Sequence, residues 1–184
     1  MALYSDRLLT DEHQLIQAAK QDPKFFGELY KLYVKRVFNY LYGRLGTSEE
    51  AEDVTSQTFL AAFEAFDGYR QDGHFSSWLF KIARNKAMDH FRQKKKTYPF
   101  DETVDVLEYH DTLRGIEHSE QKVELGKLIM ALPEKERELL RLRFLAEMSY
   151  PEIAHLVHRN EAAVKKSIYR LLARLHSQLE SSNG

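Results

Sequence analysis

Residues 75–96 (FSSWLFKIARNKAMDHFRQKKK) bring together the side-chain types with which proteins hold nucleic acid. Lysine and arginine bind phosphates, asparagine hydrogen-bonds to base edges, and an aromatic ring can stack on an unpaired base. At about 100° per residue of helix, these side chains gather on one arc. The arc holds Trp78, Lys81, Arg84, Asn85, Arg92 and Lys96. This spacing predicts a helix with one face turned toward a polyanion.

Trp78, in the middle of this arc, has two interpretations that the sequence leaves open. The ring caps the junction with another helix, or it stacks or wedges against an unpaired base. In the second case Phe75 and His74, just before the helix, share the role. The opposite arc of the helix is apolar and is predicted to face the core. It holds Leu79, Ile82, Ala83, Ala87 and Phe91.

A second nucleic-acid candidate lies near the C-terminus. Ser149 and Glu152 form the pattern of a capping box, so a helix is expected to begin at Tyr150. Asn160 is a second helix cap a few residues after that helix ends near Val157. A short helix, a turn of about three residues and a longer basic helix form the outline of a helix-turn-helix, whose second helix reads the major groove.

The second helix of this pair has a basic face opposite an apolar one. Small alanines near its start would let the helix approach a groove closely, and the cations would reach phosphates or base edges. A solvated basic face on an ordinary bundle helix is the plainer interpretation. The predicted DNA-facing residues are Ala162, Ala163, Lys166, Ser167 and Arg170, with Lys165 and Arg174 flanking them as phosphate contacts.

These elements belong to an all-α chain of two small domains. Apolar residues recur at helical spacing nearly throughout, and no alternating run predicts a strand. The predicted boundaries are a first domain at 1–96, an acidic linker at 97–121 and a second domain at 122–184. In the first domain, a helix beginning after Asp22 and Pro23 has a buried stripe, and an acidic helix runs to Phe66. The stripe holds Phe26, Leu29, Tyr33, Val37 and Tyr40.

Composition narrows the function further. The 184 residues contain no cysteine, which excludes disulfides, thiolate nucleophiles and zinc-thiolate sites. The sequence shows neither an apolar run long enough to span a membrane nor a signal peptide, so we expect a cytoplasmic protein without membrane insertion. The net charge is −1, but acidic and basic blocks alternate along the chain. This segregation predicts two polyanion-facing surfaces and one acidic face for a basic partner.

Together these stretches resemble the extracytoplasmic-function (ECF) sigma factors of the sigma-70 family. Residues 78–92 match the promoter-melting pattern W-L-x-x-I-A-R-N-x-x-x-D-x-x-R. LPEKERELLRLRFLAEMSYPEIAHLV is similar to the domain that reads the minus-thirty-five element, and AEDVTSQTF to the polymerase-binding segment. The resemblance covers most of the chain, in the family's order.

The resemblance implies roles that spacing alone does not supply. The acidic helix would bind the clamp helices of core RNA polymerase, and the second domain would dock on the polymerase flap. The loop at Phe75 and the helix of Asn85 would melt the minus-ten element and hold a flipped base. The acidic linker would thread toward the active-site channel, and an anti-sigma factor is a family expectation. The implied polymerase-binding residues are Asp53, Ser56, Gln57 and Phe59.

Four positions depart from the family's pattern. His158 stands in the turn where the family usually has glycine. Lys166 and Ser167 replace the serine and arginine of the family's reading helix, and these positions help set promoter preference. Ser56 stands where glutamine is common.

Two other classes of function remain as alternatives. An enzyme is disfavoured because the pair His155 and His158 lacks a third ligand and no glycine-rich phosphate loop is present, so no cofactor is expected. The stronger rival is a stand-alone helix-turn-helix repressor, or a helical adaptor that binds only protein. That interpretation leaves the acidic helix around Asp53 without a role, whereas a sigma factor uses it.

Overall fold

A computed structural model describes the backbone of residues 2–70, 74–97 and 120–182, and the side chains of 12–70, 74–94 and 121–181. Within these residues every regular element is helical, as predicted. The first half contains α1 (Ala2–Gln21), η1 (Pro23–Phe25), α2 (Phe26–Leu45), α3 (Ser48–Ala65), η2 (Phe66–Gly68) and α4 (Phe75–Thr97). The second half contains α5 (Glu120–Met130), α6 (Glu134–Leu140), the π-helical turn η4 (Arg141–Leu145), α7 (Tyr150–Val157) and α8 (Glu161–Ser182). The interior of the predicted linker, 98–119, lies outside the described residues.

Local signals explain where α2 and α3 begin and end. The Asp22 carboxylate accepts the Lys24 amide and Pro23 starts η1, so the predicted cap is present but opens a 3-10 turn before α2. Gly46 ends α2 with a φ of 93°, a conformation that glycine adopts without a steric penalty. The Thr47 hydroxyl then accepts the Glu50 amide and begins α3.

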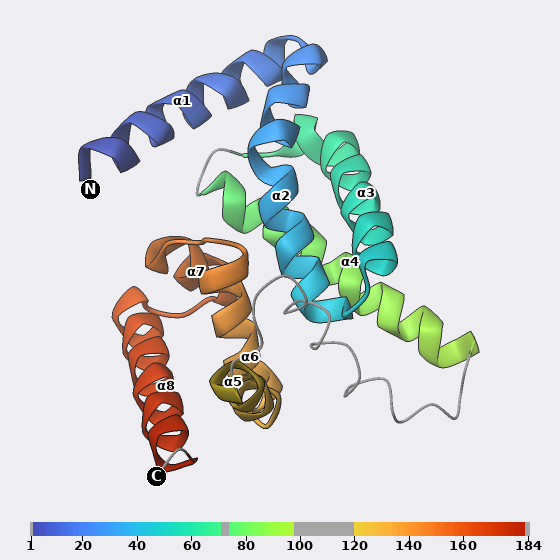
Figure 1. Cartoon of the computed structure of the whole chain (residues 1–184). Coiled ribbons are helices and arrows are strands. Elements are labelled where there is room, and N and C mark those ends of the chain that lie inside the picture. The colour runs from blue at the N-terminus through green and yellow to red at the C-terminus, as the bar shows by residue number, and fades with distance from the viewer. Residues whose placement is uncertain (1, 71–73, 98–119, 183–184) are drawn as a thin grey trace.

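The buried stripe of α2 organises the first half, and all five of its predicted residues are buried. In Figure 1, α2 and α3 lie side by side and α4 crosses them. The Glu50 carboxylate of α3 ties this crossing together, because it accepts Lys94 Nζ at 2.9 Å and lies 3.0 Å from His90 Nε2. The predicted apolar face of α4 also holds. Leu79, Ala83 and Ala87 are fully buried, and Ile82 and Phe91 pack against them at the edge.

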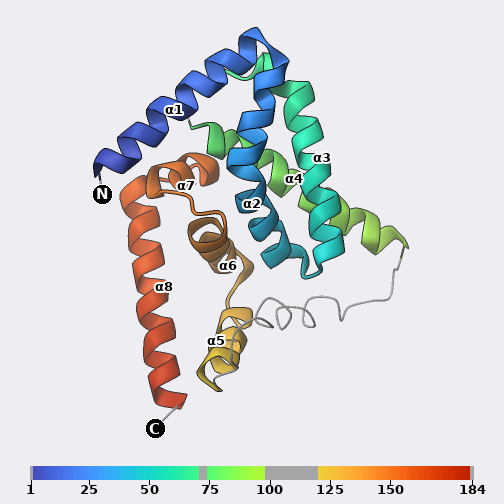
Figure 2. The ribbon, with the colours of Figure 1, turned by 45° about the horizontal axis from the view of Figure 1, so that its top comes forward.

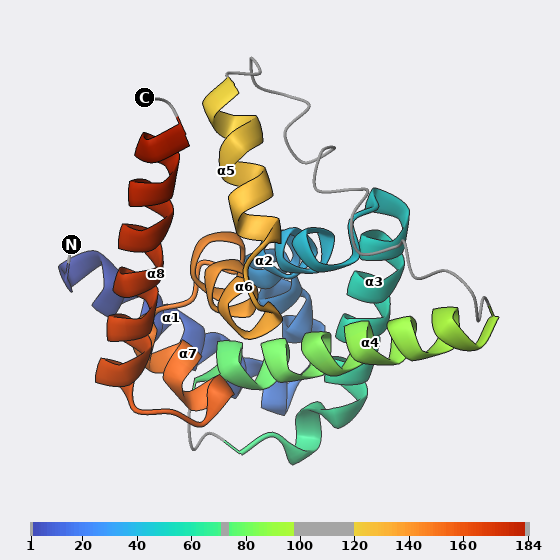
Figure 3. The same cartoon turned by 90° about the horizontal axis from the view of Figure 1, so that it is seen from below.

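In the second half, α5 and α8 lie alongside each other, and α6, η4 and α7 lie between them and the first half (Figures 2 and 3). A small cluster of leucines holds α5, α6 and α8 together. Other buried apolar residues of α6, η4, α7 and α8 join the same cluster as those of α2, α3 and α4. The two halves therefore share one core across their contact.

Candidate nucleic-acid interface

Trp78 lies at the start of α4 in a cluster of aromatic rings. Its ring centroid is 4.9 Å from that of Tyr69, 5.4 Å from that of Phe75 and 6.4 Å from that of Phe66. These neighbours bury part of the indole and leave part of it accessible. This packing fits the interpretation that Trp78 caps a junction between elements, and the accessible part of the indole leaves the stacking interpretation open as a prediction.

Phe75 does not face solvent, contrary to the prediction that it contacts minus-ten DNA. Its side chain is 1% exposed and packs against Tyr33, Tyr69 and Trp78. The first residue of α4 points into the junction of three helices, where burying an aromatic ring is strongly favourable. In this conformation Phe75 supports Trp78 and has no surface to offer to a base.

The other predicted minus-ten residues lie along one side of α4. Lys81, Asn85 and Arg92 are exposed, and Arg92 makes only a surface contact of 3.4 Å with Asp89. The Arg84 side chain is 42% exposed, and its Nε atom lies 3.7 Å from a carboxylate oxygen of Glu138 in α6. Lys96 falls within α4, but its side chain lies outside those the structure describes.

A pocket of about 260 Å³ opens beside Trp78. One wall is formed by Trp78 and Lys81 of α4, together with His74, Tyr69 and Arg70, which precede the helix. The other wall is formed by His155, Leu156 and His158 at the end of α7. The pocket thus combines aromatic rings with cations, which suits a base and its phosphate, and it lies between the two halves of the molecule.

The helix-turn-helix is present as predicted. The Ser149 hydroxyl accepts the Glu152 amide, and the Glu152 carboxylate accepts the Ser149 amide at 2.6 Å, so the capping box is complete. The α7 helix runs to Val157, and the Asn160 side chain accepts the Ala162 amide at 2.8 Å just before α8. His158 in the turn has a φ of 53°, the left-handed conformation that favours glycine.

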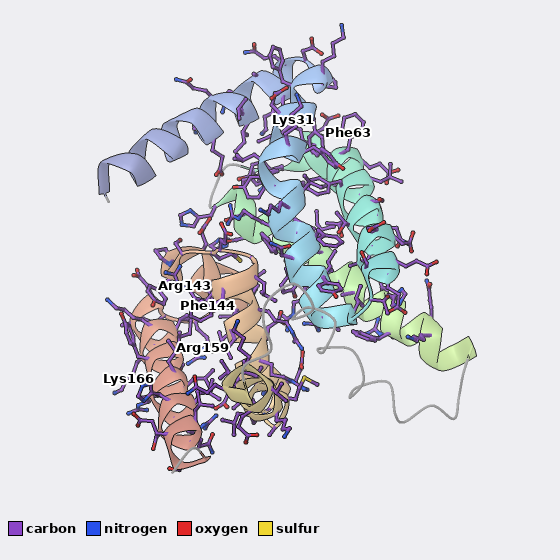
Figure 4. All side chains as sticks on the ribbon, viewed as in Figure 1. Lys31, Phe63, Arg143, Phe144, Arg159 and Lys166 are labelled. Carbon is purple, nitrogen blue, oxygen red and sulfur yellow. The ribbon has the colours of Figure 1, made fainter. Side chains whose placement is uncertain are left out.

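The predicted reading face of α8 is open. Ala162, Lys165, Lys166 and Arg170 are exposed, and Ala163 and Ser167 are half-buried at its edge. Figure 4 places Lys166 on the outer side of α8. Arg174, predicted as a phosphate contact, instead pairs with Glu136 of α6. No residue on the rest of this face is held in an ion pair among those the structure describes.

Sequence reasoning missed two features of this face. The Arg159 guanidinium donates to the Ser167 hydroxyl at 2.9 Å, and that hydroxyl donates to the Ala163 carbonyl. Arg159 therefore brings a cation to the position where the family usually carries arginine on the helix itself. Tyr150 is the second feature, because the Lys165 amine and the Arg143 guanidinium both lie over its ring, at 5.9 and 4.8 Å from the centroid.

The acidic helix α3 presents Asp53, Ser56 and Gln57 to solvent. The Gln57 amide donates to the Asp53 carboxylate at 2.8 Å, and the Ser56 hydroxyl donates to a carbonyl of its own helix. Phe59 was predicted to bind polymerase, but it is only 6% exposed because its ring packs edge-on against Tyr30. The exposed apolar residues of α3 are instead Leu60 and Phe63, at 58% and 47%.

An apolar groove of about 360 Å³ lies between α5, η4 and α8. Its walls include Leu125, Ile129, Leu140, Phe144 and Leu172. The Phe144 side chain is 54% exposed at its rim. A groove this apolar fits a hydrophobic side chain or helix of a partner.

The sequence of the chain matches known families and proteins. Residues 29–97 match the model of Sigma-70 region 2, and residues 122–175 match that of Sigma-70 region 4. The ECF RNA polymerase sigma-E factor of Salmonella typhimurium is 30% identical over 174 residues, which cover 88% of this chain and 90% of that protein. The chain belongs to the ECF sigma factors of the sigma-70 family. Sigma factor BldN of Streptomyces coelicolor is 34% identical over 164 residues, and SigW of Bacillus subtilis is 28% identical over 177.

The matched region makes up a different share of each relative's length. The match takes in 86% of this chain and 61% of BldN, so the chain spans less than two thirds of BldN. It takes in 89% of this chain and 93% of SigW. As a sigma factor, the chain binds core RNA polymerase and promoter DNA and directs promoter-specific initiation.

Two solved structures share the fold of this sigma factor. CnrH, in complex with the cytosolic domain of CnrY, aligns with a TM-score of 0.64 at 24% identity and covers 91% of this chain and 96% of its own. RpoE of Bartonella quintana, in complex with the anti-sigma factor NepR, aligns with a TM-score of 0.63 at 20% identity. This match covers 85% of this chain and 98% of RpoE. No helix among the described residues is long and apolar enough to cross a membrane.

Proposed function

We propose that α4 and α8 are the two promoter-contacting elements of this sigma factor, and that α3 is its main polymerase-contacting element. The observation that carries the proposal is that each of the two family regions presents one exposed basic face, on α4 and on α8. The chain makes and breaks no bond itself. It works in the cytoplasm, where core polymerase and promoter DNA are found.

At the minus-ten element, Trp78 and the pocket beside it take up an unpaired base. Lys81, Arg84, Asn85 and Arg92 bind the strand on either side of it, and Lys96 extends the same basic run. Unstacking a base costs a few kcal/mol, which the aromatic and cationic contacts offset. Phe75 holds Trp78 in place from the core.

At the minus-thirty-five element, α8 enters the major groove with its N-terminal residues first. Ala162 and Ala163 allow close approach, Lys166 and Arg170 reach base edges, and Lys165 binds phosphate. Ser167 contributes through the arginine that it holds, Arg159. Arg174 takes part only after it leaves Glu136.

The exposed face of α3 and the groove rimmed by Phe144 are the two surfaces that bind polymerase. Asp53, Ser56 and Gln57 meet the basic clamp helices of the polymerase, with Leu60 and Phe63 taking the apolar part that Phe59 cannot supply. The groove rimmed by Phe144 receives the apolar flap. An anti-sigma factor is proposed as a regulator, since the structural neighbour RpoE was solved in complex with the anti-sigma factor NepR.

Run-off transcription with core RNA polymerase on a randomised promoter library tests the proposal. We expect the full chain to select templates that share two short motifs and to start transcription downstream of them. A chain that neither binds core polymerase nor enriches any template would contradict the proposal. A chain that enriches a duplex motif without polymerase would favour the repressor alternative.

A further inference from the structure

Arg159 lies in the turn between α7 and α8, and hydrogen bonds fix both its backbone and the tip of its side chain. The backbone amide donates to the Ala154 carbonyl at 3.0 Å, the bond that closes the end of α7. The Nη2 atom donates to the Ser167 hydroxyl at 2.9 Å, in the second turn of α8. The long side chain is therefore held alongside α8.

The Ser167 hydroxyl can hold a cation without neutralising it. A hydroxyl has one hydrogen to donate, and Ser167 gives it to the Ala163 carbonyl at 2.8 Å. The hydroxyl oxygen is then left as an acceptor, which suits a guanidinium. Because this anchor carries no charge, the full positive charge of Arg159 stays available to another group.

Arg174, further along α8, shows the opposite arrangement. Its guanidinium pairs with the Glu136 carboxylate, so its charge is balanced within the chain. Arg159 forms no ion pair with any residue that the structure describes, although Glu161 is only two positions away. A guanidinium has five N–H donors, and the bond to Ser167 uses one of them. Donors remain on both Nη atoms, and such a pair fits the O6 and N7 atoms of guanine.

The guanidinium of Arg159 lies beside the part of α8 that is expected to enter the groove. Ala163 and Ser167 are four residues apart, so they lie on the same side of the helix. Lys166, next to Ser167, is exposed, and Figure 4 shows Arg159 and Lys166 beside the same helix. In a helix-turn-helix, the N-terminal residues of the second helix contact base edges. The arginine of the turn can therefore approach base edges together with Lys166.

We propose that Arg159 is a specificity-determining residue for the minus-thirty-five element, and that Ser167 is the positioning residue that aims it. This role rests on the proposed function of α8 and adds to it a side chain from outside the helix. The base that Arg159 reads is guanine, because a bidentate contact from arginine to guanine is the commonest specific pairing. Since the side chain is already held in place, less rotamer freedom is lost on binding.

Selection from a randomised minus-thirty-five library by the full chain assembled with core polymerase tests this role. We expect Arg159→Ala to lower the preference for guanine at one base pair by about tenfold and to leave the other positions unchanged. Arg159→Lys keeps the charge but lacks the fork of donors, so it should lose the same preference. Ser167→Ala should also lower that preference. The double variant should lose no more than Arg159→Ala alone, because both changes act through one guanidinium.

Two further variants control for the Ser167 hydroxyl. Ser167→Thr restores a hydroxyl and should recover the preference that Ser167→Ala loses. Ser181→Ala removes a hydroxyl of the same helix that also bonds to the carbonyl four residues earlier, that of Ser177. Among the described residues Ser181 holds no arginine, so selection should not change. Melting temperatures close to that of the wild type would separate a loss of reading from a loss of folding.

Other results contradict the inference. A uniform loss of affinity across all sequences in Arg159→Ala, recovered by Arg159→Lys, would identify a phosphate contact instead. A further loss when Ser167→Ala is added to Arg159→Ala would mean that Ser167 does not act through Arg159. A wild-type motif that Arg159→Ala selects unchanged would show that Arg159 reads no base, with the proposed function intact. A wild-type chain that selects no motif would overturn the proposed function as well, so the two failures are distinguishable.

Discussion

Trp78 is held on one side by aromatic rings and open on the other toward a pocket with cationic walls. We expect Trp78→Ala to reduce open-complex formation by about tenfold, because base–aromatic stacking contributes about 1–3 kcal/mol per base. Binding to duplex promoter should change little. Permanganate footprinting of the minus-ten element measures open-complex formation, and filter binding measures the affinity for duplex promoter. Trp78→Phe, which keeps a ring, should recover part of the loss, and a template opened in advance should recover most of it.

Glu152 makes stability depend on pH. Burial alone would raise the pKa of Glu152, but hydrogen bonds from the Ser149 and Ser76 side chains outweigh it and lower the pKa below its ordinary 4.5. A lowered folded-state pKa means that the carboxylate stabilises the folded chain above pH 4.5 and that this is lost as the pH falls through the folded value. We therefore expect Glu152→Gln to cost about 1–2 kcal/mol at pH 7 and progressively less below pH 4.5. Urea unfolding at several pH values measures the difference, and a constant cost across pH would contradict it.

His158 occupies a left-handed position that costs a non-glycine residue about 1–2 kcal/mol. We expect His158→Gly to raise the free energy of unfolding by about 1 kcal/mol, measured by urea denaturation. The matched control is His155→Gly within α7, which should lower it by about the same amount because glycine weakens a helix interior. A loss of stability in His158→Gly would mean that the imidazole makes a compensating contact.

Individual helices were the part of the fold best predicted from sequence. The caps at Ser149 and Asn160 and the stripe of α2 act over a few residues, so their signals are local. The burial of Phe75 and Phe59 was missed because it depends on which other helix comes to lie beside each ring. Helical spacing gives the arc on which a residue lies, and it cannot say whether a partner helix covers the edge of that arc.

The reading helix α8 is open along its predicted face, so its residues can be tested one at a time. We expect Lys166→Ala to weaken binding to the minus-thirty-five duplex by about 1–3 kcal/mol and to relax preference at one base pair, because base contacts carry specificity. Selection from a randomised duplex library by the assembled polymerase measures both. Lys127→Ala on α5, an exposed lysine away from α8's open face, is the control and should leave selection unchanged. A uniform loss across all sequences would identify Lys166 as a phosphate contact instead.

The contact between the two halves could not be foreseen from the sequence. Tyr40 and Glu138 are 98 residues apart, and neither belongs to a motif that calls for a partner. The alternating acidic and basic blocks predict surfaces of opposite charge, and that prediction assigns them to outside partners such as polymerase. What they could not show is that an acidic side chain of α6, Glu138, also pairs with Arg44 of α2 within the chain itself.

A bulky residue at Gly43 should separate the halves. We expect Gly43→Leu to raise the radius of gyration measured by small-angle X-ray scattering and to lower the melting temperature, because the side chain would occupy the space of Leu145. Gly27→Leu is the matched control in the same helix, since a Cβ there meets nothing within 4 Å. An unchanged radius for Gly43→Leu would show that the space around Gly43 yields without opening the contact.

The order of synthesis gives the contact between the two halves a consequence in time. The helices α2 and α4 leave the ribosome complete once Thr97 has emerged, whereas α7, which covers the pocket beside Trp78, is finished only at Val157. At roughly 5–20 residues per second, the 60 intervening residues take about 3–12 s. Each newly made chain therefore passes through several seconds in which α4 is complete and the pocket beside Trp78 still lacks the wall that the end of α7 supplies.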